Sequence, residues 1–487
     1  MKIYNLVRMT SKLALTGLFF GLASCSDDLE ITPYGEPTSE NFYKTSEDAE
    51  QALTAAYNPL WHMYQDFGGS NSSDIVFGDI GTDDILKGGG RVNDGPHLYE
   101  KEIYSLTTSN LAMEKIWDFN YNGILYANLV LEKVPAIEFE NEERKSGVLG
   151  EAHFLRAYYY FDLVNTFGGV PIIDRPLNPG EYNVPRSSTE ESYAFIEADL
   201  KIAIDNLPSR FDMGDDYLGH ADKGAALGLM MRVALYQNKM DLVKFYGEQL
   251  FLLPYELADF SSIFQQVGEW GSGSIFEVDF SSNSDQMGGQ MARMIRPRTK
   301  GGIGFAQIKE GLRNEFESND PRFEASFYNV PGGYGTEWYN RKYTIEPYSD
   351  YPFPTVGGKA NNSNNIRLIR LADAYLMYAE AIYENDPVKA VEYVNKVRRR
   401  ARGENPETVV PDLENSLNGK SLLEAIYHER RVELAGEGYR YHDLVRTNRA
   451  EEILGSLGFK KELNKVMPIS FAQIALSQGV LEQNPGY

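Results

Sequence analysis

Leu149–Ile173, LGEAHFLRAYYYFDLVNTFGGVPII, is the stretch of sequence that decides the fold. Its apolar residues recur at the three- and four-residue spacing of a helix and form two separate stripes. A helix with two apolar faces is covered on two sides, which predicts a place inside a stack of helices. Gly168 is expected to end the helix, because glycine adopts a positive φ at little cost. Val170–Ile173 then leaves in an extended conformation, since the residue before Pro171 avoids the helical region.

One charged residue, Arg156, lies on the first apolar stripe of this helix. A buried guanidinium requires a carboxylate or carbonyl partner, because an unpaired charge is costly to remove from water. We therefore expect Arg156 to be a paired core residue rather than a catalytic one.

The composition is that of a large globular protein. The 487 residues are enough to bury a sizeable core and to form more than one lobe. The net charge of −23 argues against nucleic acid as a partner and against docking on an anionic membrane surface. Aromatic residues make up 13% of the chain, chiefly through 32 tyrosines.

Residues 1–24 have the pattern of a secretory signal peptide, in which basic residues precede the apolar run Leu13–Ala23. That run is too short to span a bilayer. Small residues then lead to Cys25, the only cysteine of the chain. This arrangement resembles the lipobox of bacterial lipoproteins, which implies a lipid anchor on Cys25. An ordinary cleavage site followed by a chance cysteine is the alternative.

Residues 25–40 are polar and contain two prolines, which predicts a tether rather than a core element. The acidic tract Ser26–Glu30 resembles the surface-export signal of Bacteroidetes lipoproteins. The resemblance implies a location on the outer face of the outer membrane, and a plain solvated tether is the alternative.

Helical periodicity predicts several further helices. They are expected at 46–64, 110–134, 189–207, 222–238 and 240–252. The segment from Gly68 to Leu106 is rich in Gly, Asn, Ser and Asp, and we expect it to be a long loop. Long loops inside compact domains usually have a function.

An internal repeat connects two distant parts of the chain. Ala234–Asn238 matches Ala381–Asn385 at an offset of 147 residues, and each match ends one helix and precedes another. Such helix pairs resemble tetratricopeptide units, which stack because one pair cannot bury its own apolar face. The sequence predicts a mostly α fold, with a helical-repeat (α-solenoid) lobe formed by residues 41–259 and 366–487.

Residues 260–365 differ in composition and are expected to form an inserted, loop-rich and aromatic-rich lobe. Gly, Asn, Ser and Pro are frequent there, and helical periodicity is weak. Aromatic residues crowd the segment Pro331–Pro354. This crowding predicts either a small separate core or an aromatic binding surface.

Charges of both signs alternate along His428–Arg446. They are three or four residues apart, so we expect them to pair along one helix face or across a helix bent at glycine. We interpret this network as structural.

Four segments, in the same order, resemble the SusD/RagB family of surface lipoproteins, which deliver nutrients to outer-membrane transporters. They are the lipobox at Cys25, FLRAYYYFDLVNTFGGVPI at 154–172, HERRVELAGEGYRYHDLVR at 428–446 and the terminus Leu481–Tyr487. The resemblance implies a SusD-like fold and a SusC-type TonB-dependent transporter as partner, over which this protein would act as a lid.

Motifs of catalysis are missing from the sequence. The six histidines are scattered, without an HExxH pattern or close metal-ligand spacing, and neither GxSxG nor a phosphate-binding loop occurs. A glycosidase needs only two carboxylates, but 70 acidic residues make chance pairs unavoidable. We therefore expect a binding protein without catalytic residues, metal or cofactor.

Sugars present apolar C–H faces that stack on aromatic rings, and hydroxyl groups that bind carboxylates, amides and arginines. The starch-binding prototype of the SusD family has an acidic residue, an arginine and a Trp-x-x-Asn pair in this order, with further aromatic platforms after the repeats. Carried over, the resemblance implies a ligand site formed by Asp83, Arg91, Trp117 and Asn120, with Trp338 or Tyr339 completing it, and we add Asp84, Trp270 and Tyr334 to the candidate residues. A core tryptophan is the alternative for Trp117 and for Trp270.

These features together predict a cell-surface lipoprotein that captures oligosaccharides and passes them to the transporter without chemistry. A peptide-capturing lid of the same fold is one alternative, and its site would be a groove with main-chain pairing. A lipid-anchored glycosidase is another, and it would need two carboxylates facing each other across the site.

Overall fold

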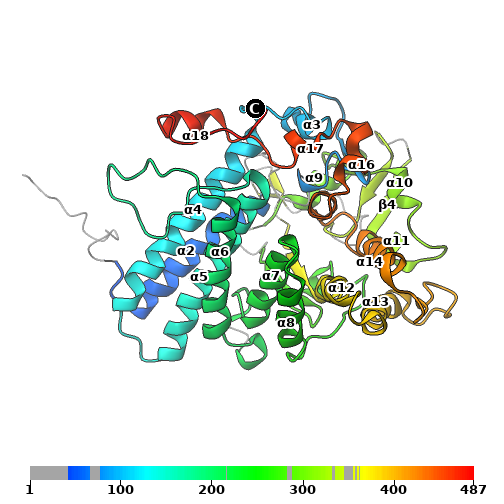
Figure 1. Cartoon of the computed structure of the whole chain (residues 1–487), viewed down its shortest axis with the longest axis horizontal. Coiled ribbons are helices and arrows are strands. Elements are labelled where there is room, and N and C mark those ends of the chain that lie inside the picture. The colour runs from blue at the N-terminus through cyan, green and yellow to red at the C-terminus, as the bar shows by residue number, and fades with distance from the viewer. Residues whose placement is uncertain are drawn as a thin grey trace, which may run out of the picture. The chain divides into compact units, whose positions relative to one another are not determined.

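The computed structural model describes residues 42–65, 77–214, 217–281, 288–331, 335–344, 355–356, 359–360 and 362–487. Cys25, the acidic tract after it and Tyr334 lie outside the described residues. Tyr43–Tyr487 forms one compact unit in which helices predominate, so the mostly α fold class is confirmed (Figure 1). The division into lobes at residues 260 and 365 stays a prediction. No helix in the described ranges is long and apolar enough to span a bilayer.

Four long helices pack together in the first half of the chain (Figure 1). They are α2 (Ser46–Gln65), α4 (Leu111–Lys133), α5 (Glu142–Phe167) and α6 (Thr189–Asn206). The helix α5 contacts the other three, and every residue from Phe154 to Phe161 is buried. The prediction that this helix is covered on more than one face is therefore confirmed.

Local sequence sets the ends of these helices. Asn110 caps α4, and its side chain accepts a hydrogen bond from the amide of Ala112. Asn141 caps α5 in the same way. At the other end of α5, Gly168 has a φ of 75°, which ends the helix as predicted.

Arg156 joins three elements inside the helical layer. Its Nε and Nη2 donate to the two carboxylate oxygens of Asp199 on α6, each at 2.7 Å. Its Nη1 donates to Asn128 on α4 at 2.7 Å and to the carbonyl oxygen of Asp174 at 3.0 Å. The predicted partners, a carboxylate and a carbonyl, are both confirmed, and Arg156 is a structural residue.

The internal repeat corresponds to two helical hairpins. The first consists of α7 (Lys223–Tyr236) and α8 (Met240–Leu250), and the second of α12 (Leu371–Ile382) and α13 (Pro387–Arg402). Although the hairpins are far apart in the sequence, α12 packs against both α8 and α7 (Figure 1). The predicted stack of paired helices is therefore confirmed.

Short antiparallel strand pairs form in the segment between the hairpins, and one of them, β1 with β3, connects this segment to the N-terminal part of the unit. They are β1 (Ile85–Gly88) with β3 (Phe305–Ile308), β2 (Ser274–Val278) with β8 (Ile366–Arg370), β4 (Phe327–Asn329) with β5 (Trp338–Asn340), and β6 (Thr355–Val356) with β7 (Lys359–Ala360). The pair β1–β3 shows that the expected loop from Gly68 to Leu106 contains a strand, and α3 (Pro96–Glu102) also lies there. Local periodicity could not predict β1, because its partner is more than two hundred residues away.

The remaining helices are short, apart from α14. They are α9 (Met291–Ile295), α10 (Glu310–Arg313) and α11 (Pro321–Ser326) in the inserted segment, and α14 (Gly419–Glu433), α15 (Arg440–Arg446), α16 (Ala450–Leu454), α17 (Lys461–Asn464) and α18 (Phe471–Leu476) near the C-terminus.

Two buried carboxylates, one at the end of α14 and one just after it, bind cations from four other parts of the chain. Glu433 accepts from Arg370 at 2.9 Å, from Arg400 on α13 at 2.5 Å, and from Arg322 on α11 at 3.3 Å. Glu437 accepts from Arg370 and from the Lys342 ammonium, both at 2.7 Å. We call Glu433, Glu437 and these four cations the Glu433 network.

The alternating charges of His428–Arg446 are structural, as predicted, but most of their partners lie on other elements. Two pairs follow the expectation: Asp443 binds Arg446 along α15 and Arg430 across the glycine-containing turn. The remaining contacts were not expected, since Arg430 also binds Asp373 and Arg446 binds Glu380, both on α12. Sequence spacing shows only the pairs within one helix.

Burial alone would raise the pKa of Glu433, but the charges of Arg400, Arg370 and Arg322 outweigh burial and lower this pKa from 4.5 to about 2. A carboxyl whose pKa is lower in the folded state stabilises the fold above its unfolded pKa. We therefore expect this contribution to be complete above about pH 4.5 and to be lost as the pH falls toward 2.

Glu433→Gln should lower the free energy of unfolding by about 3–5 kcal/mol near neutral pH, because it leaves buried cations without their carboxylate. Urea unfolding between pH 7 and pH 3 would measure the loss, which should shrink as the pH falls. The control is Glu424→Gln, whose side chain on α14 is exposed and, within the described ranges, forms an ion pair only with Lys420, at 3.4 Å. Equal effects of the two substitutions would contradict a stabilising role for the network.

Close contact between α4 and α5 depends on a glycine. A Cβ atom at Gly123 on α4 would lie 2.2 Å from the Tyr159 ring on α5. Tyr159 has little freedom to move, because it is buried and its hydroxyl donates to the carbonyl oxygen of Ala56 on α2 at 2.7 Å.

Gly123→Ala should therefore destabilise the protein by about 1–3 kcal/mol, as expected when a packed core receives an extra methyl group. Thermal unfolding followed by circular dichroism would measure the change. Gly455→Ala is the matched control, since Gly455 has helical backbone angles and open space where the added methyl group would lie. A melting temperature of Gly123→Ala at or above that of the control would argue against the steric explanation.

Candidate functional site

An open cleft of about 480 Å³ lies between α3, the start of α4 and the segment that leads into β3. We call it the α3–α4 cleft. Its lining combines apolar side chains with a few polar ones, which is the usual character of a ligand site. The lining residues are Gly95, Pro96, His97, Glu100, Ser109, Asn110, Leu111, Met294, Ile303 and Phe305.

Hydrogen bonds fix the polar wall of this cleft. The Asn110 amide donates to the carbonyl oxygen of His97 and to the carboxylate of Glu100, each at 3.0 Å. The same Glu100 oxygen accepts from the backbone amide of Thr107 at 3.1 Å. Asn110 also caps α4, so the start of this helix and the wall of the cleft are held by one side chain.

The loop before the cleft carries Arg91, whose side chain is exposed. The Lys87 ammonium lies beneath this loop and donates to the carbonyl oxygens of Gly88, Arg91 and Asp94 at 2.9, 3.0 and 2.7 Å. Burial lowers the pKa of Lys87, although Glu102 and Asp94 oppose this effect. Arg91 is therefore presented to solvent from a fixed backbone.

The predicted carboxylates Asp83 and Asp84 hold this region to the C-terminal helices. The Arg431 guanidinium on α14 binds Asp83 at 2.7 Å and Asp84 at 2.5 Å. Arg440 on α15 also binds Asp83, at 2.8 Å. Asp84 is only 2% exposed, and burial raises its pKa in spite of the two arginines. The structure thus corrects the expectation for Asp84, which is an internal ion-pair residue.

Trp117 and Asn120 lie on one face of α4, as their spacing predicts, but that face points into the core. The Trp117 side chain is 5% exposed and its ring contacts Phe167, with 5.3 Å between ring centroids. Asn120 is fully buried and donates to Asp162 on α5 at 2.6 Å. No ring face of Trp117 is open to a sugar, so the structure favours the core alternative over the stacking platform.

The aromatic candidates of the inserted segment differ in exposure. Tyr339 is 1% exposed and belongs to the core. Trp338 is half-buried between Phe323, at 5.3 Å between ring centroids, and the Arg313 guanidinium, at 4.8 Å. Trp270 is half-buried and has a φ of 51°, and its amide donates to the Glu277 carboxylate at 2.8 Å. Trp270, Trp338 and Arg91 thus remain accessible, whereas Tyr339 does not.

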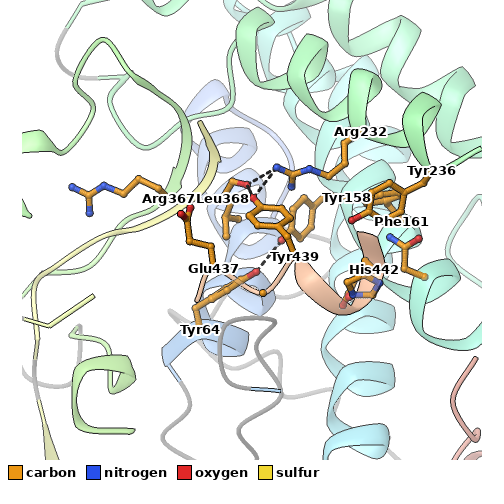
Figure 2. Close-up of a pocket in the computed structure, with 13 residues that line it drawn as sticks. Tyr64, Tyr158, Phe161, Arg232, Tyr236, Arg367, Leu368, Glu437, Tyr439 and His442 are labelled. Atoms are coloured by element: carbon orange, nitrogen blue, oxygen red, sulfur yellow. Dashed lines mark hydrogen bonds between the residues drawn. The ribbon is translucent and has the colours of Figure 1, made fainter. Parts of the chain in front are cut away.

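A second, enclosed cavity is too small to hold a sugar (Figure 2). Its volume is about 50 Å³, and one buried water needs roughly 10–15 Å³, so it has room for a few water molecules at most. Figure 2 shows Arg232 beside Tyr439 and Leu368, to which it donates at 2.8 and 3.0 Å. Burial lowers the pKa of the nearby His442 to about 4, which leaves its imidazole neutral at physiological pH.

Among the described residues, none of the predicted site residues lines the cleft, although Arg91 lies four residues before Gly95, which does. One available signal was Asn110, which precedes a helical pattern and could have been read as a helix cap. The other lining residues come from separate segments that only the fold brings together. In the described part of the chain, no three His, Cys, Asp or Glu side chains are grouped to hold a metal ion.

Two family models match successive parts of the chain. Residues 273–487 match the family described as the SusD family, and residues 44–235 match a family described as starch-binding and associating with the outer membrane. SusD-like protein P38 of Formosa agariphila is 28% identical over 510 residues, which cover 96% of each chain.

Solved structures extend this similarity to the fold. A laminarin binding SusD-like protein is 31% identical, with a TM-score of 0.80, and the match covers 91% of this chain and 100% of that one. Surface glycan-binding protein A from Bacteroides fluxus is 27% identical, with a TM-score of 0.78 and the same coverage.

Trp117→Ala should lower the free energy of unfolding by about 3–5 kcal/mol, because it leaves a cavity beside Phe167. Thermal and urea unfolding would measure this loss. Tyr126→Ala, an aromatic truncation on the same helix at a side chain that is 39% exposed, should have a much smaller effect. If Trp117→Ala kept full stability but bound saccharide more weakly, Trp117 would instead be a stacking platform for a sugar ring.

Proposed function

Because the chain belongs to the SusD family, we propose that it captures oligosaccharides in the α3–α4 cleft, without chemistry, for a TonB-dependent transporter. The observation that carries the proposal is the cleft itself. Its volume of about 480 Å³ lies within the range of roughly 300–1,000 Å³ that is typical of small-molecule sites.

The lining of the cleft suits a saccharide. Leu111, Met294 and Phe305 supply apolar contacts for the C–H faces of a sugar ring. Glu100 and Ser109 supply oxygen atoms that can hydrogen-bond to hydroxyl groups. Since the polar wall is already fixed by the Asn110 hydrogen bonds, little conformational entropy is lost on binding.

The ligand class follows from the relatives. The laminarin binding SusD-like protein and the surface glycan-binding protein A named above support a glycan rather than a peptide as the ligand. We propose laminarin or a similar neutral glycan for this chain. The lipid anchor on Cys25, the location on the outer face of the outer membrane and the SusC-type partner belong to the same proposal.

The first test is a binding screen of the protein without residues 1–25. Soluble polysaccharides, their oligosaccharides and peptides would be compared by isothermal titration calorimetry. We expect one class of glycan to bind and to remain unhydrolysed after long incubation, as judged by an unchanged number of reducing ends. Binding of peptides alone, or slow cleavage of the glycan, would contradict the proposal.

Leu111→Arg should weaken binding of that glycan at least about tenfold, a loss of about 1.4 kcal/mol, because the longer charged side chain occupies the cleft. Leu111 is 39% exposed, so the change should leave the fold intact. Leu125→Arg is the matched control on the same helix, since Leu125 is 43% exposed and lies outside the cleft. Unchanged affinity of Leu111→Arg would place the site elsewhere.

A further inference from the structure

A second open cavity, of about 520 Å³, lies between the start of α5, the end of α6 and the segment that follows α6. We call it the α5–α6 groove. The α3–α4 cleft lies at the start of α4, whereas the groove lies beyond the end of α4, where Lys145 on α5 binds the carbonyl oxygen of Pro135. A helix of 23 residues is about 34 Å long, so the two cavities are separate.

The groove offers the same kinds of groups as a saccharide site. Carboxylates and amides provide hydrogen-bond partners for hydroxyl groups, and apolar side chains and one aromatic ring provide surface for C–H faces. The side chains that matter here are Glu143, Asp205, Asp212, Asn206, Pro208 and Tyr217.

The aromatic ring of the groove is held in place. The Arg144 guanidinium lies 5.0 Å from the centre of the Tyr217 ring. Arg144 is itself fixed, because it donates to both carboxylate oxygens of Glu50 at 2.6 Å and to Glu151 at 2.8 Å. Glu151 is fully buried and also accepts from His220 at 2.7 Å. Tyr217 is therefore a preorganised surface rather than a free side chain.

The net negative charge of the groove should distinguish neutral glycans from anionic ones. The positive charge of Arg144 is already matched by Glu50 and Glu151. Among the described residues, Glu143, Asp205 and Asp212 take part in no ion pair, so the groove has an excess of negative charge. Like charges repel, so the groove should reject sulfated or uronic acid-containing glycans and accept neutral ones.

We propose that the α5–α6 groove is a second saccharide-binding site, specific for neutral oligosaccharides and independent of the α3–α4 cleft. This inference rests on the proposed function, since it assigns a second site for the same class of ligand. A polysaccharide long enough to reach both sites would bind more tightly than a short oligosaccharide, because the second contact is intramolecular.

The test compares two neighbouring charge reversals on the full mature chain. Glu143→Lys changes a residue that lines the groove, whereas Glu142→Lys changes the preceding exposed residue, which does not. Both alter the net charge and the first turn of α5 equally. Tyr217→Ala, with Tyr182→Ala as its exposed aromatic control, tests the ring. Melting temperatures would verify that each variant is folded.

Calorimetry with a short neutral oligosaccharide from the screen should give two sites for the unaltered chain. Glu143→Lys and Tyr217→Ala should each remove one site or weaken it at least about tenfold, and both controls should retain two. Leu111→Arg combined with Glu143→Lys should weaken binding at both sites, each at least about tenfold. A sulfated oligosaccharide of the same length should not bind the groove.

Two results would overturn the inference while leaving the proposed function intact. One is a single site in the unaltered chain that Leu111→Arg removes. The other is two sites that persist in both Glu143→Lys and Tyr217→Ala. Binding of no saccharide at all would instead contradict the proposed function itself, so the two failures are distinguishable.

Discussion

The fold depends on two carboxylates that are buried among cations from distant parts of the chain. Glu433 and Glu437 are four residues apart, at and just after the end of α14, and Arg370 binds both of them. Removing so many charges from water is expensive, and their attraction offsets this cost only when every partner is in place. The network therefore favours only the correctly packed fold, because its carboxylates are fully paired only when α11, α13, β8 and the turn at Lys342 are all in place.

A second set of ion pairs extends this dependence to the candidate site. Arg431 and Arg440, which flank Glu433 and Glu437 in the sequence, bind Asp83 and Asp84 just before β1. The strand β1 then pairs with β3. The chain after β1 leads to Gly95, and β3 begins at Phe305, and both of these residues line the α3–α4 cleft. The C-terminal helices thus determine the geometry of a site to which they contribute no side chain.

Much of the helical architecture was predictable, because it follows from local patterns. The two apolar stripes of α5 and the repeat at an offset of 147 residues depend on residues that are near in sequence or equivalent by repetition. The need of Arg156 for a carboxylate or carbonyl partner follows from its place on an apolar stripe, but only the fold identifies Asp199 as the carboxylate. The candidate site was less predictable. The spacing of Trp117 and Asn120 puts them on one face of α4, but only the packing of α5 shows that this face is covered. Asp83 and Asp84 were similarly ambiguous, since their arginines lie more than three hundred residues away.

The pairing of β2 with β8 has a consequence for how this protein can change in evolution. Val278 at the end of β2 and Ile366 at the start of β8 are opposite each other, so the chain between the two strands leaves and returns at the same place. The entropic cost of closing such a loop grows only slowly with its length. Insertions and deletions in the loops of that stretch should therefore be tolerated, provided that β3, Arg322 and Lys342 keep their partners and the helical repeats keep their register. Ligand preference can diversify there among descendants of one ancestral scaffold, with little cost to its stability.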